Sequence, residues 1–178
     1  MGCGLGLEIF NAKRFPLTND QVKSIVEIEE HPEVRHWLYI DVNEDTEKEF
    51  RGYRRFFKNL PRRKDVDVLV AKYDGRIVGF LALWRLEEYM AHVASIGISV
   101  HPDYWGKGVA SHLMKSAIKL ASERGFKRLE IETLAENAAM RRIAERFGFI
   151  PEGIKVKRIL KDGTYHDEVP YFLLLDDT

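Results

Sequence analysis

Hydrophobic positions along the chain follow two periods, which together predict a mixture of strands and helices. Alternation or short apolar runs indicate strands, and apolar residues spaced three or four apart indicate helices. The expected strands cover 5–10, 66–73, 76–86, 91–100, 127–134, 153–160 and 164–175. The expected helices cover 18–31, 43–60, 109–125 and 137–147. Because no linker, repeat or low-complexity segment interrupts this series, residues 1–178 are expected to form a single domain.

Turn and cap signals indicate how these elements connect. Thr18 and Gln21 have the spacing of a capping box at the start of the first helix. The dipeptides Asp74-Gly75 and Asp162-Gly163 are strong signals for tight hairpins between neighbouring strands. The expected fold is therefore α+β: a mixed, largely antiparallel sheet of about seven strands flanked by about four helices. One βαβ crossover is expected around residues 91–134.

Composition narrows the class of protein. Lys and Arg total 28, as do Asp and Glu, so the formal net charge of zero argues against a dedicated nucleic-acid binder. The basic and aromatic stretch "RRFFKNLPRRK" (54–64) is accordingly interpreted as a helix end rather than an RNA-binding patch. Cys3 is the only cysteine, which leaves no intrachain disulfide or cysteine-rich metal site. Without an apolar run of about 18 residues or a signal peptide, a cytoplasmic protein with no membrane and no metal is expected.

The segment "VHPDYWGKGVAS" (100–111) places two glycines at the start of a predicted helix. A helix N-terminus exposes unpaired N–H groups and the positive end of the helix dipole, so it favours a bound phosphate. Glycine lets the backbone close around an anion with positive φ at no steric cost. The alternative interpretation is a purely structural turn that leads into the helix.

Two other phosphate-binding motifs do not fit this loop. A P-loop needs four residues between its glycines, followed by Lys and Ser or Thr, and that spacing is absent. A dinucleotide fingerprint needs a third glycine, where Ser111 stands, and glycines directly after the strand. Neither a nucleoside triphosphate nor NAD is therefore the expected ligand.

Gly97 interrupts the apolar strand that precedes the loop. A glycine inside a strand usually marks a bulge or the close approach of a ligand. A bulge at Gly97 would leave backbone groups around residues 98–100 unpaired, just upstream of the glycine loop. An extended ligand with phosphates at the helix and a carbonyl at the strand would use both features, and acyl-coenzyme A has that shape.

The chain as a whole resembles the GNAT superfamily of N-acetyltransferases. The resemblance rests on "ISVHPDYWGKGVASHLM" and on "ENAAMRRIAERFGFIPEG", one helix and one strand later. The tail "KDGTYHDEVPYFLL" resembles subgroups that acetylate ribosomal-protein N-termini or small amines such as amino acids. The resemblance implies acetyl-CoA as co-substrate and a primary amine as acceptor, and it leaves a homodimer open.

The resemblance also implies the residues that bind coenzyme A. The backbone of Ile98, Ser99 and Val100 is expected to bond the pantetheine and the thioester carbonyl. The pyrophosphate is expected to lie in the loop and first helical turn formed by Trp105, Gly106, Lys107, Gly108, Val109 and Ala110. Asn137 corresponds to the family asparagine that contacts coenzyme A, and its position also suits a helix N-cap.

Three positions depart from the family pattern. Trp105 stands where the family usually has Gln or Arg, and Met140 stands where the ribosomal-protein subgroup often has serine. Ala144 replaces the tyrosine that protonates the departing coenzyme A in many members. A side chain at position 144 is expected on the inner face of its helix, toward the thioester. The general acid is therefore not assigned, and a coenzyme A-binding sensor or interaction protein with weak catalysis is the alternative function.

The general base is not assigned from the sequence either. The candidates by element are Glu87, Glu88, His92, Glu132 and Tyr165, of which the carboxylates also suit solvated turns and His92 suits a sheet position. The aromatic segment 31–45 lies where the family builds its acceptor wall, so Trp37 and Tyr39 are expected either there or in the core.

Overall fold

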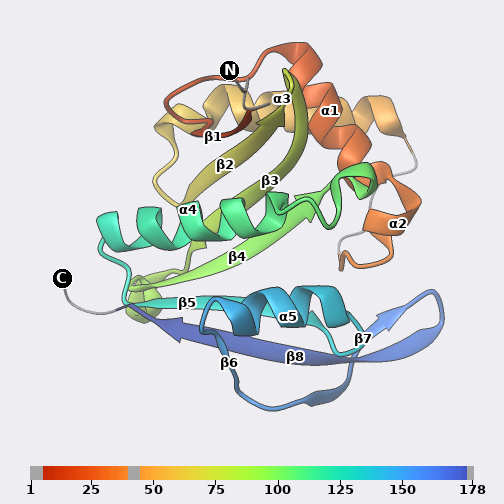
Figure 1. Cartoon of the computed structure of the whole chain (residues 1–178), viewed down its shortest axis with the longest axis vertical. Helices are drawn as coiled ribbons and strands as arrows, with labels where there is room; N and C mark the ends of the chain where they lie inside the picture. The colour runs from red at the N-terminus through yellow and green to blue at the C-terminus, as the bar shows by residue number, and fades with distance from the viewer. Residues whose placement is uncertain (1–5, 40–44, 176–178) are drawn as a thin grey trace, which may run out of the picture.

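The computed structural model describes residues 6–39 and 45–175, which form one eight-stranded sheet flanked by helices (Figure 1). The strands are β1 Leu7–Asn11, β2 Val66–Tyr73, β3 Arg76–Arg85, β4 Val93–Val100, β5 Arg128–Leu134, β6 Ile150–Pro151, β7 Lys155–Lys161 and β8 Thr164–Leu174. The helices are α1 Asn19–Glu30, α2 Pro32–Arg35, α3 Thr46–Asn59, α4 Val109–Glu123 and α5 Ala138–Arg146. Short 3₁₀ turns, η1 to η3, cover Leu60–Arg62, Glu88–Met90 and Pro102–Tyr104.

The strand order is β1-β2-β3-β4-β5-β8-β6, with β7 paired to β8. All of these pairs are antiparallel except β4 and β5, which α4 connects as the expected βαβ crossover. The predicted α+β class is confirmed. The structure adds two elements that the sequence did not predict, β6 and α2, because two residues or a single helical turn are too short to show a period.

The local signals formed as expected at several element boundaries. Thr18 accepts from the Gln21 amide at 3.3 Å, while the Gln21 side chain accepts from the Thr18 amide at 3.0 Å. Asp74 and Gly75 both have positive φ, 48° and 83°, as a two-residue hairpin turn requires. The expected start of the second helix at Asn43 lies outside the described residues. Within them, α3 begins at Thr46 and Asp45 caps it by accepting from two backbone amides.

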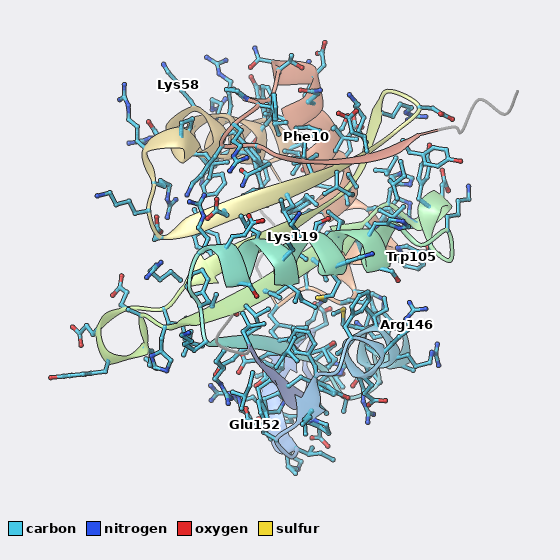
Figure 2. The ribbon with its side chains drawn as sticks, turned by 60° about the vertical axis from the view of Figure 1, so that its left-hand side comes forward. Phe10, Lys58, Trp105, Lys119, Arg146 and Glu152 are labelled. Carbon is cyan, nitrogen blue, oxygen red and sulfur yellow. The ribbon has the colours of Figure 1, made fainter. Side chains whose placement is uncertain are left out.

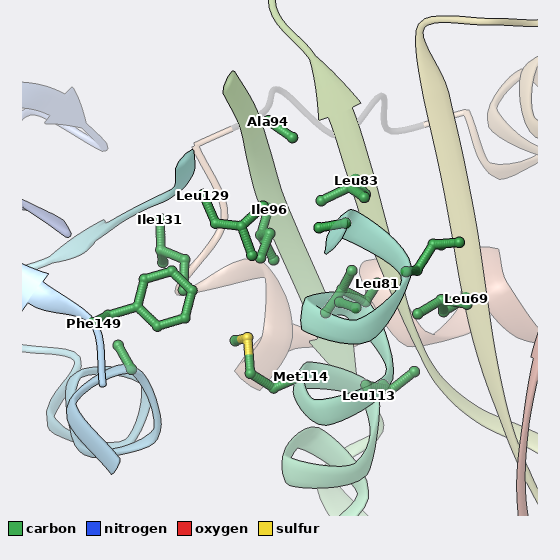
Figure 3. Close-up of a cluster of buried hydrophobic side chains, with 14 of the residues drawn as sticks. Leu69, Leu81, Leu83, Ala94, Ile96, Leu113, Met114, Leu129, Ile131 and Phe149 are labelled. Carbon is green, nitrogen blue, oxygen red and sulfur yellow. The ribbon is translucent and has the colours of Figure 1, made fainter. Parts of the chain in front are cut away.

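The sheet separates two hydrophobic layers. On one face α4 and α5 pack against β2 to β5, with Leu81, Leu113, Met114 and Phe149 fully or almost fully buried (Figure 3). On the other face α1 and α3 pack against the opposite side of β2 and β3. Among the described residues, no helix is long and apolar enough to cross a membrane.

The parallel pair β4 and β5 is the feature that positions the site. Its register extends over only three residue pairs, from Val93↔Arg128 to Ser95↔Glu130. Beyond them the two strands diverge, as Figure 1 shows between β4 and β5. The C-terminal half of β4 therefore faces a gap in the sheet instead of a neighbouring strand.

Candidate active site

A cavity of about 1660 Å³ fills the gap between β4 and β5 and continues to both faces of the sheet. Its walls come from elements all around that gap: α1, α2, α3, parts of β2, β3 and β5, the end of β4, the glycine loop, the start of α4 and one side of α5. A volume of this size exceeds that of ordinary small-molecule sites. It can therefore hold a long ligand and a second, smaller one together.

Backbone groups of β4 face this cavity. The Leu86 amide donates to the Val93 carbonyl at 3.0 Å, and the His101 amide donates to the Val78 carbonyl at 2.8 Å. In an antiparallel pair such bonds fall on alternate residues, so Ser99 and its odd-numbered neighbours pair with β3. The amides and carbonyls of Ile98 and Val100 therefore face the gap, whereas those of Ser99 do not.

Of the two interpretations of Gly97, a bulge or the close approach of a ligand, the bulge is wrong. Residues 94–100 of β4 pair with β3 without any register shift, and the irregularity lies between Ala71 and Lys72 of β2 instead. The groups that the bulge was meant to free are exposed because β5 turns away. Gly97 contributes space: a Cβ atom there would meet no heavy atom within 4 Å, and the residue lines the cavity.

Trp105 connects the end of β4 to the glycine loop. Its indole Nε1 donates to the Val100 carbonyl at 2.8 Å, so this side chain anchors the loop without reaching toward an anion. In Figure 2 Trp105 lies at the N-terminal end of α4. The bond occupies the Val100 carbonyl, which leaves the Val100 amide and both backbone groups of Ile98 facing the cavity.

The glycine loop presents an open helix terminus. Gly106 and Gly108 have φ of 71° and 81°, and Gly108 is the N-cap of α4 with no side-chain cap bond. The amides of residues 108–111 precede the first bond that the helix can form with itself, from His112 to the Gly108 carbonyl at 3.0 Å. An anion at the cavity wall can accept from these N–H groups and is favoured by the helix dipole.

Gly79 in β3 brings this terminus close to the sheet. A Cβ atom at Gly79 would lie 3.0 Å from the Ser99 carbonyl oxygen and 3.3 Å from a methyl group of Val109. The absence of a side chain thus lets the first residue of α4 pack directly against the end of β4. The isolated glycine in the "RIVGFLALWRL" strand was the available signal for this close approach, and it was missed in the sequence.

Two arginines of α5 add positive charge to the same end of the cavity. Arg142 and Arg146 line it, and Arg146 Nη2 donates to Ser111 Oγ at 2.6 Å, which links α5 to the first turn of α4. Figure 2 shows Arg146 and Trp105 near the same end of α4. Lys107 does not line the cavity; its ammonium lies 4.9 Å from the centre of the Tyr104 ring. Only its backbone belongs to the loop.

Asn137 and Met140 line the cavity, whereas Ala144 does not. The Asn137 side chain accepts from the Met140 amide at 3.1 Å and caps α5, as its position suggested. Ala144 is fully buried in the hydrophobic layer with Met114 and Phe149. The expectation that a side chain at position 144 points toward the thioester is therefore wrong, because that face of α5 packs against the core.

The opposite end of the cavity has aromatic walls. Trp37 and Tyr39 line it, as expected for an acceptor wall, together with Tyr53, Phe56 and Trp84. Burial, followed by the charges of Glu168, Glu132 and Glu136, raises the pKa of Tyr39, so its phenol stays protonated. Lys161 of the β7–β8 hairpin fixes this segment by donating to the carbonyls of Arg35, His36 and Leu38.

Most of the candidate bases lie elsewhere. Glu87 and Glu88 lie in the turn between β3 and β4, Tyr165 is exposed on β8, and none of the three lines the cavity. His92 is exposed just before β4, so the expected sheet position is wrong. Glu132 does line the cavity, but Lys155 Nζ donates to its carboxylate at 2.6 Å.

Glu29 of α1 is the titratable residue that the sequence did not single out. It is 7% exposed and lines the cavity. Burial, with a smaller effect from the nearby charge of Glu49, raises the pKa of Glu29 from 4.5 to about 7. The signal was available in the helical pattern of α1, since Glu29 follows Val22 by seven residues and Val26 by three and so falls on the same apolar face. Among the described residues, no group of His, Cys, Asp and Glu has the arrangement of a metal site.

Comparison with known proteins places this geometry in a family. Residues 24–149 match the family described as the acetyltransferase (GNAT) family. The L-amino acid N-acetyltransferase AaaT of Escherichia coli is 32% identical over 112 residues, which cover 62% of this chain and 69% of AaaT.

Two solved structures share the fold along nearly the whole chain. The yncA structure of Salmonella typhimurium, which contains its cofactor acetyl-CoA, has a TM-score of 0.78 and 20% identity over 97% of this chain and 95% of that one. The ribosomal-protein-alanine N-acetyltransferase of Brucella melitensis has a TM-score of 0.75 and 20% identity over 95% of this chain and 100% of its own. The resemblance inferred from the two sequence motifs is confirmed: the chain belongs to the acetyltransferase (GNAT) family.

Proposed function

We propose that this chain transfers the acetyl group of acetyl-CoA to a primary amine, either the N-terminus of a protein or a small amine. One observation carries the proposal. The uncapped N-terminus of α4, with its two glycines of positive φ, opens into the same cavity as the unpaired edge of β4. A ligand with phosphates at one end and a thioester at the other matches that pair of features.

The residues present suit each part of coenzyme A. The amides from Gly108 to Ser111 can receive the pyrophosphate, and Arg142 and Arg146 can balance the remaining phosphate charge. The Ile98 amide and carbonyl suit the amide groups of the pantetheine arm. The Val100 amide is the remaining donor on this edge of β4, and it can stabilise the oxyanion that forms on the thioester carbonyl.

The aromatic end of the cavity is the proposed acceptor side. AaaT is named for L-amino acids and the Brucella melitensis protein for the alanine of a ribosomal protein. Both acceptors are primary amines, which supports the same chemical class for this chain. The amine nitrogen would attack the thioester carbonyl directly, and the enzyme would contribute mainly alignment and oxyanion stabilisation.

A thiol-release assay with acetyl-CoA and a set of primary amines tests this function. We expect amine-dependent release of coenzyme A. In a melting experiment, acetyl-CoA at about 100 times its Kd should stabilise the fold by roughly 2.7 kcal/mol, and NADH or ATP should stabilise it far less. Stabilisation without thiol release for any amine would indicate a coenzyme A-binding protein that is not a transferase. Equal stabilisation by ATP would show that the adenine and phosphates alone are recognised.

A further inference from the structure

Glu29 has a buried carboxylate with an oxygen that no hydrogen bond satisfies. Its Oε2 is inaccessible and has no partner among the described residues, and the residue as a whole is 7% exposed. A buried polar atom without a partner costs free energy, so its retention calls for an explanation. The residue also lines the cavity, so a rotation of its carboxylate that turns Oε2 toward a ligand there would supply the missing donor.

Three of the other carboxylates around the gap are already engaged. Glu132 accepts from Lys155 at 2.6 Å, Glu136 is bonded to His166, and Glu145 accepts from the Tyr171 hydroxyl at 2.9 Å. These side chains line the cavity on the β5 and α5 side. Glu29 lies on the α1 side, where its carboxylate has an oxygen left for a ligand.

The position of α1 brings Glu29 near the reacting end of β4. The His31 ring, two residues further along, packs edge-on against the ring of His101 with 5.4 Å between centroids. His101 directly follows β4, so the C-terminal end of α1 lies beside the unpaired half of that strand. Gly97 of β4 lines the same cavity as Glu29, and a Cβ atom at Gly97 would meet no heavy atom within 4 Å.

The charged groups around Glu29 favour a cationic ligand. From α3, Glu49 and Lys48 both line the cavity, but of the two only the charge of Glu49 acts on the Glu29 carboxyl. The segment after α2 contributes the protonated phenol of Tyr39. The lining residues of β3 and β4 carry no charge: Phe80, Ala82, Trp84 and residues 96–100. On α1 itself Glu30 also has a buried oxygen without a partner, but Glu30 does not line the cavity.

We propose that Glu29 is the catalytic base of this enzyme, binding the acceptor as an ammonium ion and removing its first proton. This inference rests on the proposed acetyl transfer. The Glu29 carboxylate takes one proton from R–NH₃⁺, and the nitrogen lone pair then forms the N–C bond to the thioester carbonyl. The C–S bond breaks, and its electron pair leaves with the sulfur. The second ammonium proton is lost as the amide forms and ends on the thiolate, giving coenzyme A.

The same surroundings define the class of acceptor. A carboxylate pair, Glu29 and Glu49, selects a positively charged amine. The walls beside it are aromatic or apolar, with Trp37, Phe56 and Trp84 among the lining residues. The acceptor is therefore a cationic primary amine with an apolar or aromatic body next to the amino group.

The test compares Glu29→Gln with Glu30→Gln, a control on the same helix with a similar unsatisfied oxygen outside the cavity. Thiol release is measured with 2-phenylethylamine, an aromatic amino acid amide and a short peptide with a free N-terminus. We expect Glu29→Gln to lower kcat by about 10² to 10⁴ while the acetyl-CoA Kd is unchanged. Glu30→Gln should retain wild-type rates.

A pH profile separates a base from a structural residue. In the wild type, kcat/KM should rise with pH through an apparent pKa near that of Glu29 in the free enzyme, about 7. Glu49→Gln removes a neighbouring negative charge, so it should move this limb to lower pH without removing it. Glu29→Gln should lose the limb.

A second measurement does not depend on turnover. In ¹³C NMR with labelled glutamate, the signal that Glu29→Gln removes should titrate near pH 7, and 2-phenylethylamine should lower its pKa. Equal rates and equal pH limbs in Glu29→Gln and Glu30→Gln would overturn the base assignment while leaving acetyl transfer intact. A Glu29 signal unaffected by every amine would also overturn it. Failure of the wild type to release thiol with any amine would instead refute the proposed function, and the assignment with it.

Discussion

Replacing Glu29 with glutamine is expected to change how the stability of the protein depends on pH. The free energy of unfolding of the variant minus that of wild type should be larger at neutral and alkaline pH than in acid. Glu29 has a raised pKa because burial penalises its charged form, so the folded protein holds this proton more tightly than the unfolded chain does. Between pH 4.5 and about 7 the folded state thus binds more protons. The free energy of unfolding therefore falls as pH rises through this window, and that contribution is absent from the glutamine variant.

The expected size follows from the shift. Raising a carboxyl pKa from 4.5 to about 7 corresponds to on the order of 3 kcal/mol in the free energy of unfolding. The difference between Glu29→Gln and wild type should therefore grow by roughly this amount from pH 4.5 to pH 8. A further difference in the free energy of unfolding, the same at every pH, is added to this change. It arises because the glutamine amide is also buried where the carboxylate oxygen had no hydrogen-bond partner.

Urea unfolding at several pH values measures this difference directly. Glu27→Gln is the matched control, since Glu27 lies on the same helix but is exposed, and its curve should run parallel to that of wild type. Parallel curves for Glu29→Gln and wild type would refute the reasoning, because they would show that Glu29 titrates alike in the folded and unfolded states. Such a result would also show that burial does not raise the pKa of Glu29, a property on which the assignment of Glu29 as the base depends.

Four further substitutions test other parts of the site. Gly108→Glu should abolish acetyl-CoA binding in calorimetry, since it places a carboxylate at the N-terminus of α4. The protein should still fold, because the positive φ at this position costs a non-glycine residue only about 1–2 kcal/mol. An unchanged Kd for acetyl-CoA would show that the phosphates bind elsewhere. Arg146→Ala should weaken acetyl-CoA binding about tenfold, with the largest effect at low salt. The control Lys119→Ala, on the far part of α4 (Figure 2), should leave this binding unchanged. Equal effects of the two substitutions would indicate only a change in net charge. Ala144→Tyr should lower the free energy of unfolding by about 1–3 kcal/mol through overpacking, with no gain in rate; faster thiol release would show that the ring reaches the thioester. Lys161→Met should raise the KM for the amine several-fold without affecting the acetyl-CoA Kd, because the segment after α2 loses its hydrogen bonds, and a change in the acetyl-CoA Kd alone would contradict this role.

Much of the fold could be predicted because its determinants are local. The capping box at Thr18, the Asp74-Gly75 turn and the periodicity of α4 each act within a few residues, so their spacing is visible in the sequence. The glycines at the mouth of α4 belong to this group, since their positive φ depends on the residues of the loop itself. This local chemistry, with the two family motifs, determined the family and the expected ligand from the sequence.

The catalytic side of the cavity depended on contacts between distant segments. The spacing of Val22, Val26 and Glu29 places Glu29 on the apolar face of α1, but the cavity that Glu29 lines is formed by strands and helices distant in the sequence. Arg146 meets Ser111 across 35 positions, and the backbone of Ile98 is open because β5 diverges, not because Gly97 forms a bulge. For Ala144, the sequence predicts its position in the helix. The sequence does not predict the hydrophobic core that surrounds this residue. Burial and partner choice are properties of the assembled layers, so tertiary structure alone decided which ionisable groups lie in the cavity and which of them has an oxygen left for a substrate.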